Sequence, residues 1–418
     1  MRVEIVTIGY EVLSGRTLDT NFAWLARALE SVSVQVGWHT SVGDDVGEIG
    51  KALAHALSRA DAVVMTGGLG PTPDDVTRKA VSAALGRPLQ LDEGVLEAIR
   101  ERARRAGRKL APSIESQALL PLGATSWPNR LGTAPGILLE VNGKPVILLP
   151  GVPQEMEAIA SDSVVPYLRG RTGVAVETFT LRTMGVFESA LHEKIGALPN
   201  DWPGASLAYL PSWFGVDLRV TVTGADAAQV TRTAERALAE LRATVGPVIY
   251  AEGSQTMEER VGELLLGLGW RLAAAESCTG GLAAKRVTDV PGSSRWFERG
   301  YITYSNASKL ELLGVRAADL EAHGAVSAPV AEQMAEGARK RAGVDVGLGI
   351  TGIAGPDGGS DEKPVGLMFI AVASPRGTAV RRFQFAGTRW AVRERGAQSA
   401  LDLVRRQLLG LPLEARLD

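Results

Sequence analysis

The sequence predicts an α/β protein built from several domains. At 418 residues, the chain is too long for one compact core and indicates two to four domains. Short apolar segments alternate with helical stretches along its first part, as in sheets whose strands are joined by helices. The 48 glycines exceed the usual share of about 7%. We place this excess in the turns between strands and helices, where ligand loops form.

The first 170 residues carry the clearest alternation. We expect strands at Val3–Ile8, Val34–Val42 and Ala62–Thr66. Helices are expected between them at Asn21–Ser31 and Val46–Arg59. This order predicts a mostly parallel sheet with ligands at the carboxyl ends of its strands.

The loop Thr66–Asp75, TGGLGPTPDD, falls at such a strand end. Its glycines allow the backbone to fold around a phosphate, and an acidic pair opens the next helix. The loop lacks both GxGxxG and GK[ST], so it is neither a dinucleotide fingerprint nor a P-loop. The candidate nucleotide-binding residues are Gly67, Gly68, Gly70, Thr72 and Asp74.

Acidic residues follow several of these strands. A pyrophosphate beside carboxylates requires a divalent cation, and oxygen ligands suit Mg²⁺ or Mn²⁺, with Co²⁺ as a further choice. Asp44, Asp75 and Glu155 are the candidate metal ligands, with Asp45 beside them. The alternative for the aspartate pair is a simple helix cap.

Residues 171–252 show no catalytic constellation. We expect a helix at Glu188–Leu198, a strand at Val216–Thr223 and a helix at Ala227–Val245. Residues 251–256 read as a linker, after which Met257–Leu268 begins the C-terminal region as a helix.

Ser277 marks the most informative turn. A short buried strand, Trp270–Ala275, precedes it, and Gly280 and Gly281 open a helix that continues through Val287. The first N–H groups of such a helix lack intrahelical partners, so they can hold an oxyanion. This arrangement is typical of a hydrolase nucleophile.

A serine needs a base, and none of the four histidines lies in a Gly-rich turn. Lys309 is the better candidate, because a strand at Ile302–Tyr304 and an N-cap at Ser305 place it one turn into a helix closed by Gly314. Burial would have to lower its pKa, and Tyr304 would relay the proton or orient the amine. In the alternative, Ser277 only caps a helix and Lys309 is solvated.

Cys278 is a rival nucleophile beside Ser277. It has no histidine partner in the motif, so we interpret it as a small packing residue.

A second Gly-rich stretch, Gly349–Gly359, follows an apolar run, Val344–Ile350, with the character of a buried parallel strand. Its amides are placed to hold a phosphate, with a tight structural loop as the alternative. The candidate substrate-binding residues are Thr351, Gly352, Ala354 and Gly355, with Arg389 as the charged partner of the phosphate.

Composition excludes several function classes. The net charge of −2 gives no general attraction to nucleic acid or to an anionic membrane. A hydrophobic content of 45% allows a sizeable core. The start resembles a strand and not a signal peptide, and apolar runs are too short to span a bilayer. With one cysteine, no intrachain disulfide forms, and we expect a soluble, cytoplasmic protein.

Three motifs in the C-terminal part, ESCTGG, PGSSRWFERGYITYSN and GITGIAGPDGGSDEKPVG, carry a resemblance from about 254 to 409. The segment resembles the CinA C-terminal domain, the nicotinamide mononucleotide amidohydrolase family. The resemblance implies a Ser277 nucleophile that works with Tyr304 and Lys309, releases ammonia, yields nicotinic acid mononucleotide and needs no metal. The substrate-binding residues of the first motif would be Thr279, Gly280 and Gly281. Thr388 departs from the acidic residue usual before the arginine of the late motif.

TGGLGPTPDDVT, GTAPGI at 132–137 and LPGVPQEM at 149–156 resemble the molybdopterin-binding fold, specifically the CinA N-terminal domain. Some members hydrolyse ADP-ribose to AMP and ribose 5-phosphate with a divalent metal. Tyr10, between Gly9 and Glu11, departs from the polar residue common there and weakens a metal role for Glu11.

The middle region is similar to a small KH-like α+β module. No GXXG loop, which nucleic-acid-binding KH units need, appears between its elements. A structural or dimer-forming role is preferred, and family precedent implies a homodimer. The expected domains are 1–170, a molybdopterin-binding-like domain; 171–252, the KH-like module; and 253–418, an α/β amidohydrolase domain.

The leading hypothesis is a pyridine-nucleotide salvage enzyme that acts on nicotinamide mononucleotide and on ADP-ribose. A nucleotide- or pterin-binding scaffold without chemistry is the second. The third is an accessory factor in DNA uptake or recombination, against which the near-neutral charge counts.

Overall fold

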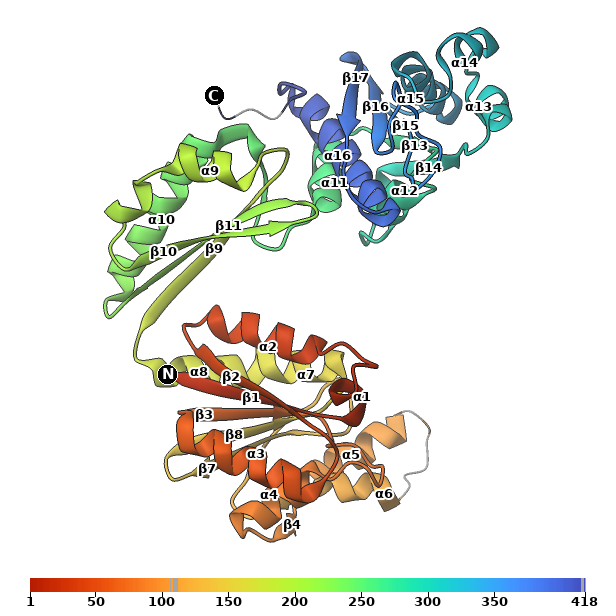
Figure 1. Ribbon diagram of the computed structural model, residues 1–418. Helices are drawn as coiled ribbons and strands as arrows, with labels where there is room; N and C mark the ends of the chain where they lie inside the picture. Colours follow the sequence, from red (N-terminus) through yellow and green to blue (C-terminus); the bar gives the residue numbers. More distant parts are fainter. Residues whose placement is uncertain (106, 108–111, 415–416, 418) are drawn as a thin grey trace. The chain divides into compact units, whose positions relative to one another are not determined.

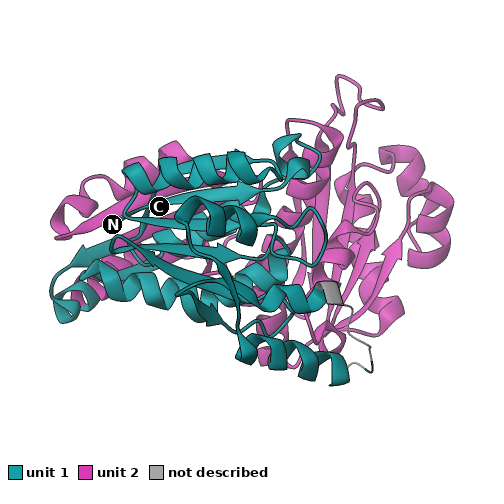
Figure 2. Ribbon diagram, turned by 90° about the horizontal axis from the view of Figure 1, so that it is seen from below, with its two compact units in different colours: residues 1–178, 222–231 teal, residues 179–221, 232–418 magenta. Residues whose placement is uncertain are grey.

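The computed structural model describes residues 1–105, 107, 112–414 and 417 (Figure 1). The chain divides into two compact units (Figure 2). One contains residues 1–178 and 222–231, and the other contains 179–221 and 232–418. None of the described helices is both long and apolar enough to cross a membrane.

A six-stranded mixed sheet forms the N-terminal domain, in the order β2-β1-β3-β8-β7-β6. The first four strands run parallel to one another, and β7 and β6 are antiparallel additions at one edge. The predicted parallel sheet is therefore confirmed for β2 to β8 and extended by two antiparallel strands. The strands are β1 (Arg2–Ile8), β2 (Gln35–Val42), β3 (Ala62–Thr66), β6 (Thr125–Trp127), β7 (Gly136–Val141) and β8 (Lys144–Leu149).

Helices cover both faces of this sheet because its strands are apolar on both sides (Figure 1). Along β1, Val3 and Ile5 enter one core and Val6 and Ile8 enter the other. The helices of the first face are α2 (Thr20–Glu30), α7 (Pro153–Ile159) and α8 (Val165–Thr172), and those of the second are α3 (Val46–Arg59), α4 (Thr77–Leu85) and α5 (Glu93–Arg105). The smaller elements are α1 (Tyr10–Leu13), α6 (Pro112–Glu115) and the paired strands β4 (Leu89–Leu91) and β5 (Leu119–Pro121).

The middle module is a four-stranded sheet, β10-β11-β9-β12, with two helices. Its predicted strand and its predicted long helix are confirmed, whereas the helix from Glu188 ends at Ile195 and not at Leu198. Three of its strands were not predicted. The elements are β9 (Ala175–Thr183), α9 (Glu188–Ile195), β10 (Ala205–Ser212), β11 (Gly215–Gly224), α10 (Ala227–Val245) and β12 (Ile249–Glu252).

The C-terminal domain is built on a five-stranded sheet, β14-β13-β15-β16-β17. Strands β14, β13 and β15 run parallel, and β16 and β17 continue antiparallel. The strands are β13 (Leu272–Glu276), β14 (Phe297–Ile302), β15 (Val346–Gly352), β16 (Leu367–Ser374) and β17 (Gly377–Gln384). The strand predicted at Ile302–Tyr304 is placed too late in the chain, because β14 ends at Ile302 and Tyr304 lies in the following loop.

Alternate residues of β13 face two different cores, with Leu272 and Ala274 on one side and Ala273 and Ala275 on the other. Figure 1 shows the helices around this sheet. The first core is completed by α11 (Met257–Leu268), α12 (Leu282–Thr288) and α16 (Arg389–Leu409), and the second by α13 (Asn306–Leu313) and α15 (Ala328–Ala342), with α14 (Ala317–His323) beside them.

Candidate functional site

Ser277 follows the last residue of β13, where the chain turns toward α12. Its backbone N–H donates to the carbonyl of Ile350 at 3.0 Å, which fixes the turn to the neighbouring strand β15. Gly280 and Gly281 have φ values of 60° and 90°, a region that strongly favours glycine. The predicted strand-to-helix turn is therefore confirmed, and its two glycines are required by the backbone.

The side chain of Lys309, in α13, extends to Ser277. Ser305 caps α13 by accepting from the N–H of Ser308 at 3.1 Å. One turn later, the Nζ of Lys309 lies 3.1 Å from the Oγ of Ser277 and 2.8 Å from the carbonyl oxygen of Thr303. The lysine is only 1% exposed. It is not a solvated surface residue, and the N-cap of α12 is Gly281, not Ser277.

Burial lowers the pKa of the Lys309 ammonium below its ordinary value, because the charged form loses hydration. A fraction of the amine is then neutral at lower pH than for a free lysine, as a general base requires. Burial also raises the pKa of the Cys278 thiol to about 12. The rival nucleophile is thus held in its unreactive thiol form.

Glu276 corrects one expectation about this turn. Its buried carboxylate accepts from the N–H groups of Gly281, Ala283 and Ala284 at 3.1, 3.1 and 2.8 Å. The N–H of Gly280 donates to the carbonyl of Ser277. The prediction that the first amides of α12 are available for an oxyanion is therefore wrong for these groups. A carboxylate of the chain itself occupies the positive end of the helix.

Tyr304, Arg389 and Gly355 form a hydrogen-bonded group next to Lys309, whose Nζ lies 3.5 Å from the carbonyl oxygen of Tyr304. Arg389 donates to the hydroxyl of Tyr304 at 3.1 Å and to the carbonyl of Gly355 at 2.8 Å. Tyr304 is 62% exposed, so its ring borders solvent. In the position of the family's acidic residue, Thr388 accepts from the N–H of Ala391 and caps α16. The departure at Thr388 thus preserves a cap that orients the start of the helix.

Two other predicted substrate-binding side chains are buried. Thr279 is fully buried, and Thr351, 1% exposed, donates its hydroxyl to the carbonyl of Ala325 at 2.8 Å. Thr351 is thus bonded within the chain, the buried hydroxyl of Thr279 has no partner among the described residues, and neither side chain is open to a substrate. Ala354 is also buried, whereas Gly352 is partly exposed. Gly280, Gly281, Gly352 and Gly355 remain predictions as points of close backbone approach.

Arg393 was missed from the sequence. It lies one helical turn after Arg389 and donates to the carbonyl of Thr279 at 2.7 Å, which ties α16 to the serine turn. The spacing of two arginines by four residues, which places them on one helix face, was the available signal.

The second candidate site is a pocket of about 440 Å³ in the N-terminal domain. It lies at the carboxyl ends of β1, β3 and β8, as the strand order predicts. Except for Asp45, the structure brings together the residues predicted for nucleotide and metal binding: Gly67, Gly68, Gly70, Thr72 and Asp74, with Asp44, Asp75 and Glu155. Glu11 also lines this pocket. Asp45 instead caps α3 by accepting from Glu48.

The glycine loop points its carbonyls away from the pocket. Thr77 donates to the carbonyl of Gly67 at 2.8 Å, and the buried Arg78 donates to those of Leu69 and Gly70. In a trans peptide, the N–H of the next residue points opposite to the carbonyl, which applies to the amides of Gly68 and Gly70 but not to Pro71, which has no N–H. A side chain at Gly68 would lie 2.3 Å from the hydroxyl of Thr77, so only glycine fits. The loop therefore presents amides to a ligand, as anion sites do.

The carboxylates of this pocket have partners of their own. Asp44 accepts from the N–H of Tyr10 at 2.9 Å, Asp75 accepts from the N–H of Thr72 at 2.8 Å, and Glu155 accepts from Asn129. The N-cap of α4 is Val76, so the aspartates before it do not serve as its N-cap. Within the described part of the chain, no three His, Cys, Asp or Glu side chains are grouped closely enough to hold a metal ion. The oxygen donors nevertheless suit Mg²⁺, which is usually held by one or two carboxylates together with substrate phosphates.

These features define a three-domain α/β protein with a serine–lysine pair in one domain and an anion pocket in another. Three family models match in the same order: the probable molybdopterin binding domain at 4–170, the damage-inducible protein CinA KH domain at 178–251 and the CinA C-terminal domain at 254–408. The chain belongs to the CinA family.

Full-length relatives support this membership. A putative competence-damage inducible protein of Symbiobacterium thermophilum is 43% identical over 98% of this chain and 99% of its own length. A CinA-like protein of Gemmatimonas aurantiaca is 44% identical over 97% of this chain and 96% of its own length. Among solved structures, the CinA protein of Thermoplasma acidophilum is 40% identical and covers 38% of this chain and 94% of its own, with a TM-score of 0.37.

Proposed function

We propose that the C-terminal domain hydrolyses the carboxamide of nicotinamide mononucleotide to nicotinic acid mononucleotide and ammonia. One observation carries this proposal: the Nζ of a buried lysine lies 3.1 Å from the Oγ of Ser277. A base within hydrogen-bond distance of a serine, with its pKa lowered by burial, is the pair that amide hydrolysis without histidine needs.

In the first half of the reaction, neutral Lys309 takes the proton of the Ser277 hydroxyl. The Oγ forms a bond to the carboxamide carbon, the C–N bond breaks, and the proton returns to the departing nitrogen, which leaves as ammonia. In the second half, Lys309 takes a proton from water, and the hydroxide oxygen attacks the acyl carbon. The ester bond to Oγ breaks, nicotinic acid mononucleotide is released, and Ser277 regains its proton.

Arg389 is the proposed partner of the substrate phosphate. It is exposed and uses two of its five N–H donors on Tyr304 and Gly355. The remaining donors suit a phosphate. Tyr304, which accepts from the same arginine, would border the nucleotide.

An ammonia-release assay on nicotinamide mononucleotide, with and without a chelator, tests this function. We expect one ammonia for each nicotinic acid mononucleotide, at the same rate in both conditions, since Lys309 supplies the base. Absence of ammonia from well-folded protein would reject the proposal.

The N-terminal pocket favours a second activity, the metal-dependent hydrolysis of ADP-ribose to AMP and ribose 5-phosphate. The amides of Gly68 and Gly70 would hold a phosphate, and Asp75 and Glu155 would hold Mg²⁺, Mn²⁺ or Co²⁺. The cation would offset the charge repulsion between pyrophosphate and carboxylates.

AMP formation with each of the three cations tests this activity. The Asp75→Asn variant should lose most of it, whereas Asp45→Asn, outside the pocket, should keep it. If ADP-ribose binds but no cation supports turnover, the domain is instead a nucleotide- or pterin-binding scaffold.

A further inference from the structure

A pocket of about 680 Å³ lies within the second compact unit. The β10–β11 hairpin, the end of β17 and the helix α16 border it, and neither Ser277 nor Lys309 lines it. Small-molecule sites usually measure about 300–1,000 Å³. The pocket is therefore large enough for a ligand of its own, separate from the proposed substrate.

Aromatic rings form part of its walls. Phe383 and the nearby Phe385 are stacked, with ring centroids 5.5 Å apart and planes 12° apart. Across the pocket, Trp213 at the tip of the hairpin is 48% exposed. The guanidinium of Arg395 lies 4.9 Å from the centroid of its ring. Phe383 and Phe385 are partly buried and Trp213 is about half exposed, so Trp213 offers the more open ring to a planar ligand.

Arginines supply the charge of the pocket. Arg381, Arg395 and Arg406 line it, together with two carboxylates, Glu188 and Asp402. The carboxylate of Asp402 is shared between two arginines. It accepts from Arg406 at 2.7 Å and from Arg405 at 2.8 Å, and Arg405 is buried and does not line the pocket. Glu188 is exposed at the rim.

Arg381 retains donors for a ligand, whereas the free nitrogen of Arg406 is enclosed by the protein. Arg406 is 1% exposed, and its second terminal nitrogen is buried without an acceptor among the described residues. Arg381 donates to the carbonyl of Leu413 at 2.6 Å, which uses one of its five donors. Burial lowers the pKa of the Arg381 guanidinium, although the negative charge of Glu414, near the C-terminal end of the chain, acts to raise it. An anion would offset the cost of burying these charges.

We propose that this pocket binds a small organic anion that carries a planar aromatic ring and is about the size of a mononucleotide. Its anionic group lies against Arg381, and its ring lies between Trp213 and the pair Phe383 and Phe385.

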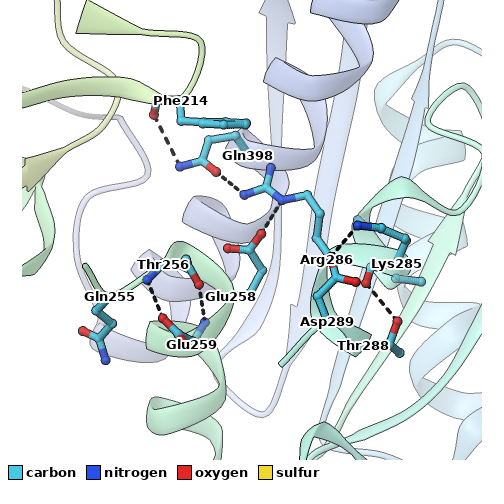
Figure 3. A network of polar contacts seen from close by, with 12 residues as sticks. Phe214, Gln255, Thr256, Glu258, Glu259, Lys285, Arg286, Thr288, Asp289 and Gln398 are labelled. Atoms are coloured by element: carbon cyan, nitrogen blue, oxygen red, sulfur yellow. Dashed lines mark hydrogen bonds and ion pairs between the residues drawn. The ribbon is translucent and has the colours of Figure 1, made fainter. Parts of the chain in front are cut away.

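The same hairpin is bonded to the serine domain (Figure 3). Gln398 of α16 donates to the carbonyl of Phe214, next to Trp213, at 3.3 Å. Gln398 in turn accepts from Arg286 of α12, which also pairs with Glu258. The guanidinium of Arg286 lies 5.0 Å from the centroid of the Phe214 ring. A chain of polar contacts through Gln398 and Arg286 therefore joins the hairpin to α12, the helix that follows Ser277.

Hydrogen–deuterium exchange of the full chain with AMP as the probe tests the proposal. AMP should slow exchange at least threefold in the segments 211–216 and 381–386. Adenosine lacks the anion and ribose 5-phosphate lacks the ring, so each should need at least tenfold higher concentration for the same protection. Arg381→Gln and Arg395→Gln should each weaken the AMP effect at least tenfold. Arg382→Gln, an exposed arginine of β17 outside the pocket, should not.

Three outcomes overturn the proposal. The first is AMP protection confined to the N-terminal loop 66–75, without protection at 211–216 or 381–386. The second is equal protection by adenosine, which removes the anion requirement. The third is an equal loss in Arg382→Gln, which reduces the effect to general attraction by positive charge.

Discussion

The two candidate sites both lie at the carboxyl ends of parallel strands, yet they are built from opposite chemical groups. Around Ser277, a lysine is buried and its pKa is lowered, so the base belongs to the chain. The N-terminal pocket instead presents glycine amides and carboxylates, of which those of Asp44, Asp75 and Glu155 are bonded within the chain. A site of the first kind supplies its own base, whereas one of the second kind needs a cation from outside to hold a pyrophosphate. The same kind of strand edge thus carries two chemically different sites, decided by the loops.

Removal of the serine or the lysine gives the largest expected effect. We expect Ser277→Ala and Lys309→Met to lower ammonia release from nicotinamide mononucleotide by roughly three orders of magnitude or more, because the two act as a unit. AMP formation from ADP-ribose should be unchanged in both, which serves as the folding control. Retained ammonia release in Ser277→Ala would contradict the assignment, and a parallel loss of both activities would mean that the two sites are not independent.

The pH dependence of kcat/KM sharpens the contrast. Lys309 acts as a base only when neutral, so ammonia release should rise with pH, about tenfold per unit, and level off above its pKa. Since burial lowers this pKa, the plateau should begin below the value of about 10.4 for a free lysine. The Lys309→Arg variant keeps the positive charge, and it should abolish both the activity and its rise with pH. A rate that falls as pH rises through this range would exclude the lysine as base.

Tyr304→Phe should have a moderate effect. The phenol accepts one hydrogen bond from Arg389 at 3.1 Å and is largely exposed, and such a bond contributes about 1 kcal/mol. We therefore expect kcat/KM to fall about fivefold, mainly through KM, as the arginine loses one support. A loss as large as that of Ser277→Ala would instead give the phenol a direct part in proton transfer.

Much of the fold was predictable from the sequence, because apolar periodicity marks buried elements. The helices Val46–Arg59, Ala227–Val245 and Met257–Leu268 have the predicted bounds. The misplaced strand β14, FERGYI, lies at the sheet edge and none of its residues is fully buried, so burial leaves little pattern in it. Strands β9 and β10 were missed for the same reason, since many of their residues are only partly buried or exposed.

The candidate sites were predictable to a different degree. Motifs identified Ser277 and Lys309, and the strand order identified the pocket edge, since both depend on local sequence and topology. The role of Glu276 was not predictable, because it depends on how a five-residue turn folds back to place a carboxylate on three amides. The burial of Thr279 and Thr351 likewise depends on packing between distant segments.

The smallest expected effect concerns Thr388, where this chain departs from its family. Its hydroxyl accepts from the N–H of Ala391 at 3.3 Å and caps α16 just before Arg389. Replacement of such a cap by alanine costs about 1 kcal/mol, so in Thr388→Ala the amide of Ala391 should exchange with solvent about fivefold faster. Thr388→Asp restores both a cap and the family's acidic residue, and should exchange no faster than the natural chain. Equal exchange in the alanine and aspartate variants would mean that the cap does not hold this helix, and that Arg389 is oriented by its bonds to Tyr304 and Gly355 alone.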